Sequence, residues 1–193
     1  TAAAEKRAFT VHDLVAMVRI ADPHHSPDGT MVAFTVTTMD LEANKGRSDL
    51  WLAALDGSGL RRLTTHEAGD SSAAWRGDRS LYFLSSRSGS SQVWRLATGG
   101  GEAEQVTRLP LDVEAFQVAP KGDALYVALA VFPDCAEPVP CTAERVAAED
   151  ARKTSGRIYD RLFVRHWDSW EDGRRNHVFR IPLGPDGLVS GEP

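Results

Sequence analysis

The chain has 193 residues, of which 42% are hydrophobic and 25% are charged, and its net charge is -5. This composition is that of an ordinary globular protein and excludes disordered and fibrous classes. The excess of acidic residues leaves no basic stripe that could release counterions from a nucleic acid, so we expect no nucleic-acid partner. The longest apolar run, Ala124 to Phe132, is about half of the ~20 residues that a membrane-spanning helix needs, so we expect no membrane partner.

The first predicted element is a short helix from Phe9 to Ile20. Thr10 is placed to cap its N-terminus. Four apolar residues fall on one face at helical spacing, which predicts that this face packs against the sheet that follows; they are Val11, Leu14, Val15 and Val18. Residues 1–25 are thus interpreted as a helix and a first strand that lead into the main fold.

Three similar strings follow, and each leads from turn residues into an apolar strand. They are Ser26–Phe34, Trp75–Phe83 and Ala119–Val127. Their spacing gives a unit of roughly 45 residues, which is typical of repeat folds. The strands are apolar on both faces rather than alternating, as expected for sheets that are covered by neighbouring sheets.

Two further strands repeat behind the first. The strings Asp49–Leu52, Gln92–Leu96 and His177–Ile181 predict a third strand of each unit, and Leu60–Thr64 and Glu104–Thr107 predict a closing strand after a glycine-rich turn. Four antiparallel strands in roughly 45 residues are the content of a β-propeller blade. The predicted fold class is therefore all-β: about three blades of an incomplete β-propeller, with a short N-terminal helix and a helical insertion in the third blade.

The boundaries follow from these strings. Residues 26–131 hold blades 1 and 2 and the start of blade 3, residues 132–176 form the insertion, and residues 177–193 end blade 3 before its last strand. Three blades cannot close a ring of at least four. We therefore expect the rest of the propeller in another polypeptide or in residues outside this sequence.

The insertion begins with Cys135 and Cys141, which are separated by a proline-rich loop. This geometry favours a disulfide over a zinc site, for which no further ligands lie close in sequence, and two free thiols are the alternative. A disulfide implies an oxidising compartment, and the small residues at the N-terminus suit the mature side of a cleaved export signal. We expect a periplasmic or secreted protein.

A helix is predicted next, from Thr142 to Lys153, with Thr142 as its cap and a Glu149–Lys153 pair on its surface. The segment from Ile158 to Arg175 follows and is dense in aromatic residues and arginines. It is named the arm below.

Several of these strings together resemble the prolyl oligopeptidase family of serine peptidases, and in particular bacterial enzymes of the acylaminoacyl-peptidase and dipeptidyl peptidase V type. Phe9–Phe34 looks like the start of the mature chain in that family, and Ile158–His177 looks like its blade insertion. The resemblance implies a propeller that caps a C-terminal α/β-hydrolase domain and positions short peptide substrates for it. Oligomeric state is not fixed, and a homo-oligomer stays open.

The catalytic residues of such an enzyme are absent from these 193 residues. A nucleophile elbow needs Gly-x-Ser-x-Gly, which does not occur here. The six histidines show neither metal-ligand spacing nor an activated nucleophile beside them, so we expect no catalytic residue, no metal and no cofactor in this chain.

The arm holds the candidate substrate-binding residues, because carboxylates suit a peptide ammonium group and aromatic rings confine a side chain. They are Trp167, Asp168, Trp170, Glu171 and Asp172. An equally weighted alternative is that these carboxylates pair locally with Arg161, Arg165, Arg174 and Arg175. For the chain as a whole, the alternative function is a stand-alone protein-binding propeller of the translocation-associated type.

Overall fold

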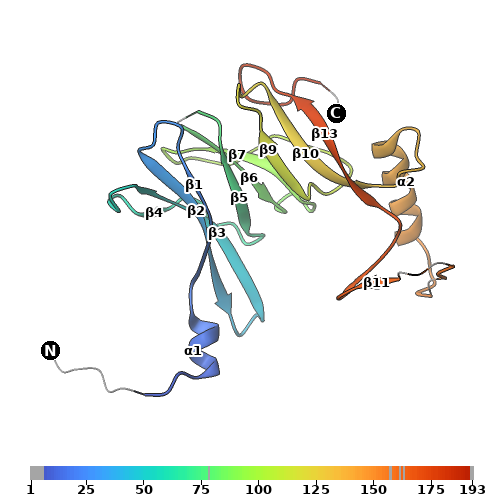
Figure 1. Ribbon diagram of the computed structural model, residues 1–193, viewed down its shortest axis with the longest axis horizontal. Helices are drawn as coiled ribbons and strands as arrows, with labels where there is room; N and C mark the ends of the chain where they lie inside the picture. The colour runs from blue at the N-terminus through green and yellow to red at the C-terminus, as the bar shows by residue number, and fades with distance from the viewer. Residues whose placement is uncertain (1–6, 78, 157, 161, 163, 192–193) are drawn as a thin grey trace. The chain divides into compact units, whose positions relative to one another are not determined.

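The computed structural model describes residues 7–77, 79–156, 158–160, 162 and 164–191 (Figure 1). The chain divides into two compact units. The first comprises Thr1–Gly89 and Trp94–Glu104, and the second comprises Ser90–Val93 and Gln105–Pro193. Among the described residues, no helix is long and apolar enough to span a membrane.

Three sheets follow one another along the chain, in agreement with the repeat. The first contains β1 (Arg19–His25), β2 (Met31–Asp40), β3 (Lys45–Ala54) and β4 (Arg61–Arg62) in that order. The second contains β5 (Asp70–Trp75), β6 (Ser80–Ser85), β7 (Gln92–Ala97) and β8 (Glu104–Gln105). The third has the order β13-β10-β9, from β9 (Ala115–Val118), β10 (Ala124–Val131) and β13 (Arg175–Pro182). The predicted all-β class of blade-like sheets is confirmed.

Each four-stranded sheet is closed by the same side-chain hydrogen bond. The Leu50 backbone N–H donates to Thr64 Oγ1 at 3.0 Å in the first sheet, and the Val93 N–H donates to Thr107 Oγ1 at 2.9 Å in the second. The closing strands β4 and β8 are only two residues long, shorter than predicted, because the threonine hydroxyl satisfies the next amide in place of a longer ladder.

The apolar core of the first unit lies between its sheets. Both faces of β6 are covered, as the uninterrupted apolar run predicts. Trp75 and Trp94 pack against this core from its edge. Its buried members are Ala33, Leu50, Leu52, Ala73, Leu81, Phe83 and Leu96.

The repeat extends to an irregularity that apolar patterning does not reveal. Asp22 in β1 and Ser72 in β5 both have a positive φ, of 55° and 57°, and the register of each strand shifts at that point. A non-glycine residue with positive φ is uncommon, and a bulge at the edge of a sheet discourages pairing with a foreign strand. The first two sheets are thus matched in backbone detail as well as in sequence.

The N-terminal helix differs from the prediction. Helix α1 spans only Val11–Ala16, with Thr10 as its cap as predicted, and none of its residues is buried. Thr10 and Asp13 also form a capping box. The helix ends early because Arg19 already pairs with Thr37 in the β1–β2 ladder. The predicted extension to Ile20 is therefore wrong. The predicted packing on the first sheet is confirmed in part, because α1 contacts β2 while Val11, Leu14 and Val18 stay exposed.

The insertion leaves the third sheet after β10 and returns at β13, as predicted (Figure 1). It contains α2 (Pro138–Asp150) and a two-residue hairpin of β11 (Arg165–His166) and β12 (Ser169–Trp170). The helix begins four residues before the predicted start, because proline is tolerated in a first helical turn.

Two predicted details of this helix are wrong. Thr142 is buried inside α2, where its Oγ1 accepts the Phe132 backbone N–H at 2.9 Å, and Glu137 holds the cap position. Glu149 pairs with Arg152 at 2.8 Å instead of with Lys153, which lies beyond the end of the helix.

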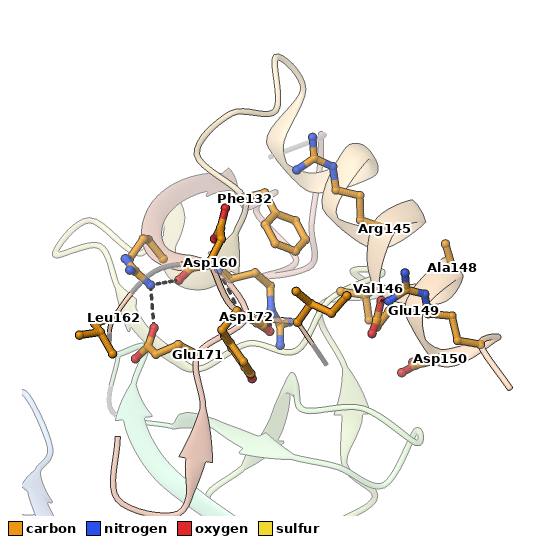
Figure 2. A pocket seen from close by; sticks show the side chains of 16 residues that line it. Phe132, Arg145, Val146, Ala148, Glu149, Asp150, Asp160, Leu162, Glu171 and Asp172 are labelled. Atoms are coloured by element: carbon orange, nitrogen blue, oxygen red, sulfur yellow. Dashed lines mark hydrogen bonds and ion pairs between the residues drawn. The ribbon is translucent and has the colours of Figure 1, made fainter. Parts of the chain in front are cut away.

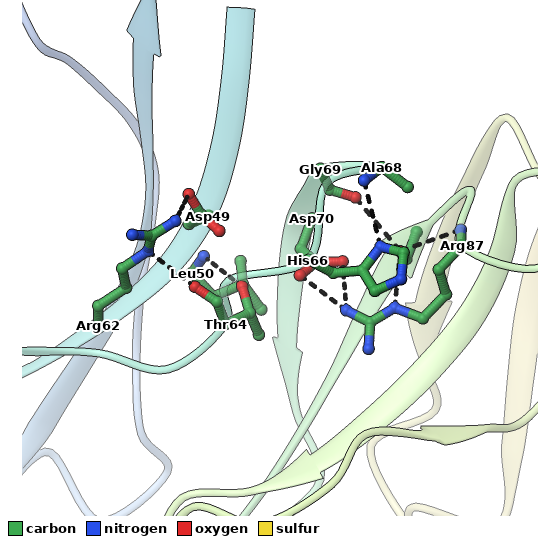
Figure 3. A network of polar contacts seen from close by, with 10 residues as sticks. Asp49, Leu50, Arg62, Thr64, His66, Ala68, Gly69, Asp70 and Arg87 are labelled. Carbon is green, nitrogen blue, oxygen red and sulfur yellow. Dashed lines mark hydrogen bonds and ion pairs between the residues drawn. The ribbon is translucent and has the colours of Figure 1, made fainter.

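Two strands each carry a buried carboxylate that binds an arginine (Figure 3). They are Asp49 in β3 and Asp70 in β5. Asp70 is completely buried and accepts two hydrogen bonds from Arg87, at 2.7 and 2.8 Å. Asp49 accepts from Arg62 at 2.6 Å, but its second oxygen is buried with no hydrogen-bond partner among the described residues. Burial raises the pKa of Asp49, and the hydrogen bond from Arg62 opposes that rise.

The raised pKa gives a first prediction. Because Asp49 has a higher pKa in the folded than in the unfolded chain, its ionisation lowers the free energy of unfolding. This loss is complete above the folded-state pKa and disappears as the pH falls to the ordinary carboxyl pKa of about 4. Asp49→Asn should therefore raise the melting temperature at neutral pH, and the difference from the wild type should shrink as the pH is lowered from 7 to 4.

The second sheet shows that an amide is tolerated at this position. Gln92 is the equivalent residue, and its side-chain oxygen accepts from Thr107 Oγ1 and from the Leu109 backbone N–H, at 2.8 and 3.0 Å. Thermal unfolding at several pH values is the measurement. A variant that is less stable than the wild type at pH 7 would show instead that the ion pair with Arg62 outweighs burial.

Candidate functional site

Three contacts hold the first half of α2 to the segment that directly follows β10. The disulfide between Cys135 and Cys141 is present, with 6.0 Å between the Cα atoms. The Thr142 hydrogen bond to Phe132 lies one residue further along the helix. Arg145 donates two hydrogen bonds to Asp134, at 2.9 and 2.8 Å, which lowers the pKa of that carboxyl, and its guanidinium lies 5.0 Å from the centre of the Phe132 ring.

A pocket of about 890 Å³ opens between α2 and the arm (Figure 2). Its apolar lining includes Phe132, Val146, Ile158 and Leu162. Charged side chains dominate the rest of the lining. The carboxylates are Glu149, Asp150, Asp160, Glu171 and Asp172, and the arginines are Arg145, Arg152, Arg174 and Arg175.

Most of these charges are paired within the insertion. Arg174 contacts Asp172 at 2.7 Å, and Arg175 contacts Glu171 at 3.0 Å. Arg152 contacts Glu149 on the helix, as described above. The charge of Arg145 is directed to Asp134, which does not line the pocket. Among the described residues that line the pocket, these contacts leave more negative than positive charge.

Two carboxylates account for the excess. Neither Asp150 nor Asp160 forms an ion pair with another residue that the structure describes, and both are exposed to solvent. Asp150 is also the last residue of α2, where the unpaired carbonyl groups of the helix carry partial negative charge. The arrangement is suited to a cationic group such as an ammonium.

The structure separates the predicted substrate-binding residues into two groups. Glu171 and Asp172 line the pocket, and Trp170 stacks on the lining residue Tyr159 with 5.9 Å between ring centres. Trp167 and Asp168 form the turn between β11 and β12 and do not line the pocket. Trp167 is 85% exposed and has a positive φ of 51°.

The structure also contains some of the local ion pairs that the alternative predicted. Arg174 and Arg175 pair as that alternative stated, whereas Arg165 donates to the Trp167 carbonyl at 2.5 Å and lies over the Trp170 ring. Arg161 lies outside the described residues. The sequence analysis missed Asp160 and the acidic end of α2, because nothing in their spacing shows that the helix and the arm face a common pocket.

The first comparison with known proteins concerns the sheets. Residues 10–130 match the family model described as TolB beta propeller domain. This stretch is more than half of the chain and runs from the cap of α1 into β10. The chain belongs to the TolB beta propeller domain family. The matched part of the propeller domain ends just before the insertion.

Curated relatives extend the similarity over the insertion. The chain is 27% identical over 171 residues to the uncharacterized peptidase YuxL of Bacillus subtilis, which covers 88% of this chain and 24% of that protein. It is 27% identical over 186 residues to dipeptidyl-peptidase 5 of Porphyromonas endodontalis, which covers 95% of this chain and 26% of that protein. The propeller chain thus spans about a quarter of the length of these relatives.

A solved structure shows the same fold. The acylaminoacyl peptidase of Pyrococcus horikoshii superposes with a TM-score of 0.64 at 14% identity, over 92% of this chain and 25% of that one. The resemblance to the propeller part of prolyl oligopeptidase family peptidases is confirmed by these relatives and by the propeller family itself.

The ties of α2 give a second prediction. Replacing both cysteines by serine should remove about 2 kcal/mol of stability, because the disulfide closes a short loop. Thr142 and Arg145 still hold the helix in the variant. Hydrogen exchange measured by mass spectrometry should therefore become faster in residues 135–141 and change little in residues 145–150. Alkylation of both cysteines in the untreated protein would show that the bridge does not form.

Proposed function

We propose that this chain is the propeller part of a serine exopeptidase that removes short fragments from the amino ends of peptides. The peptidase relatives that cover 88% and 95% of the chain support this proposal. The serine, aspartate and histidine of the reaction would belong to an α/β-hydrolase domain encoded by the same gene, outside residues 1–193. The propeller would gate and position the substrate for that domain.

The insertion pocket would receive the amino end of the substrate. An exopeptidase must stop the peptide at a fixed depth, and a group outside the catalytic residues has to do so. The observation that carries the assignment is the excess of negative charge in a pocket that is partly apolar, since a free ammonium needs carboxylates and a neighbouring side chain needs apolar contact.

The same charge favours one peptidase type over the other. A blocked, acylated amino end carries no positive charge, so it would gain nothing from Asp150 and Asp160. A free ammonium would gain charge-assisted hydrogen bonds from them. We therefore propose dipeptidyl-peptidase activity rather than acylaminoacyl-peptidase activity.

Export from the cytoplasm is part of the proposal. The Cys135–Cys141 disulfide supports a periplasmic or secreted location, because disulfides persist in oxidising compartments.

The stand-alone binding module has weaker support. The Tol-Pal system protein TolB of Anaeromyxobacter dehalogenans is 47% identical to this chain, but over 51 residues that make up 26% of it. The two peptidase relatives match over a stretch more than three times as long.

The third prediction tests the pocket in the full-length enzyme. Asp160→Asn and Glu171→Gln should lower kcat/KM for a dipeptidyl substrate with a free amino end by roughly ten- to a hundredfold, which corresponds to ~1.4 to 2.8 kcal/mol. A substrate with an acetylated amino end should be affected much less. Steady-state kinetics with the two substrates and thermal unfolding of each variant are the measurements.

Asp168→Asn is the matched control, because Asp168 lies on the same arm, is a carboxylate and does not line the pocket. It should leave kcat/KM close to that of the wild type. Normal kinetics in both pocket variants, or a joint loss of stability and activity, would contradict the anchoring role and make the arm structural. An effect at Asp168 alone would move the site to the hairpin turn.

A further inference from the structure

The β11–β12 hairpin of the arm has two weaknesses. All six residues from Arg165 to Trp170 are exposed, and a two-stranded hairpin without a covered face is only marginally stable in water. Its turn consists of Trp167 and Asp168, and the φ of Trp167 is 51°. Glycine usually takes such a position in a two-residue turn, because a positive φ is unfavourable for a bulky residue. The hairpin therefore needs a contact beyond its backbone ladder.

The Arg165 side chain supplies contacts that address both weaknesses. Its Nε–H donates to the Trp167 carbonyl at 2.5 Å, which fixes the turn. Its guanidinium lies 5.4 Å from the centre of the Trp170 ring, and Trp170 is its partner on the opposite strand. Within the part of the chain that the structure describes, Arg165 contacts no carboxylate, in contrast to Arg174 and Arg175. Its planar cation holds the turn and the aromatic ring instead of forming an ion pair.

Trp170 connects this arginine to the pocket in two ways. Its ring stacks on the ring of the lining residue Tyr159, with an angle of 25° between the two planes. The next residue along the chain, Glu171, also lines the pocket, and its backbone N–H donates to the Val164 carbonyl at 3.1 Å, directly beyond the paired strands. A shift of Trp170 would therefore displace both an aromatic ring and a carboxylate of the pocket wall.

We propose that Arg165 is a positioning residue of the pocket. It does not line the pocket itself. By holding Trp170, it keeps the Tyr159 ring and the Glu171 carboxylate in the arrangement that binds the amino end of a peptide; the identity of that ligand rests on the proposed function. A charge-assisted hydrogen bond is short and directional, so a small displacement of the carboxylate weakens the binding of an ammonium group.

The fourth prediction concerns Arg165→Lys in the full-length enzyme. Lysine keeps the positive charge but lacks the planar guanidinium and its Nε–H donor. KM for a dipeptidyl substrate with a free amino end should rise by ~tenfold and kcat should change by less than ~twofold, because binding is affected and the reaction is not. Thermal unfolding should show a change of ~2 °C or less in the melting temperature, since the residue is exposed.

Arg180→Lys is the matched control. Arg180 is an exposed arginine of β13 that does not line the pocket, and its substitution should leave KM close to that of the wild type. A wild-type KM in Arg165→Lys, or an equal rise in KM in both variants, would overturn the proposal.

A double-mutant comparison tests whether Arg165 acts through Trp170. Trp170→Ala removes the ring that the guanidinium holds, so adding Arg165→Lys to this variant should raise KM by less than ~twofold more. Non-additivity of this kind is expected when one residue acts only by way of the other. A further rise of ~tenfold in the double variant would show that Arg165 acts on the substrate directly and would overturn the positioning role.

Hydrogen exchange separates this proposal from the proposed function. If the wild-type enzyme cleaves no peptide with a free amino end, the proposed function fails, and exchange in residues 164–171 alone decides the positioning role. Sub-second labelling and mass spectrometry should show faster exchange of this segment in Arg165→Lys than in the wild type or Arg180→Lys, because the hairpin opens more often. Unchanged exchange in Arg165→Lys would overturn the proposal whatever the activity.

Discussion

The antiparallel ladder between β10 and β13 is the constraint on which the insertion depends. Eight residue pairs run without interruption from Ala124 with Pro182 to Val131 with Arg175, although a long segment of chain separates the two strands. A register slip of one residue would turn every side chain to the other face of the sheet, and Ile181, the one buried residue of β13, would lose its place in the core. Both ends of the insertion are therefore held at adjacent positions.

This constraint explains why a propeller sheet tolerates so long an insertion. The entropy of closing a loop grows only slowly with its length, and the ladder is complete without any contribution from the inserted residues. The segment from Phe132 to Arg174 is free to acquire its own packing. It does so by folding α2 and the arm around a pocket instead of extending the sheet.

The charged side chains that line the pocket can exchange partners, because their ion pairs are partly exposed to solvent. Asp172 and Glu171 each keep about a third of their side-chain surface exposed while they contact Arg174 and Arg175. Such pairs contribute little to stability, and exchanging one partner for a ligand group disturbs the fold little. Arg145 is different, because its charge is committed to Asp134 at the base of α2 and its flat face covers Phe132.

The repeated strands could be predicted from the sequence because their signals are local. Turn residues and an apolar run recur together in the three similar strings, and the structure has a strand in each of them, namely β2, β6 and β10. The end of α1 could not, because the ladder between β1 and β2 overrides helical periodicity at Arg19. The start of α2 was missed because Pro138 and Pro140 favour a loop by composition, whereas proline also fits the first turn of a helix.

The candidate site was predictable only in part, for a related reason. Glu171 and Asp172 stand out in an aromatic segment, but Asp160 does not, and its place in the pocket lining depends on a helix from another part of the insertion. Contacts between α2 and the arm are not encoded in any spacing of residues. Composition indicated the segment that lines the pocket, and three-dimensional packing determines which of its residues do so.

The way α2 is attached has a consequence for how the pocket works. Its ties, at Cys141, Thr142 and Arg145, all lie in the first two turns. The carboxylates that it contributes, Glu149 and Asp150, lie in the last turn, where the residues are exposed. Helix ends open at low free energy, whereas segments fastened to a sheet do not. The helix is thus fastened where it joins the propeller, and the carboxylates that line the pocket lie at its other end.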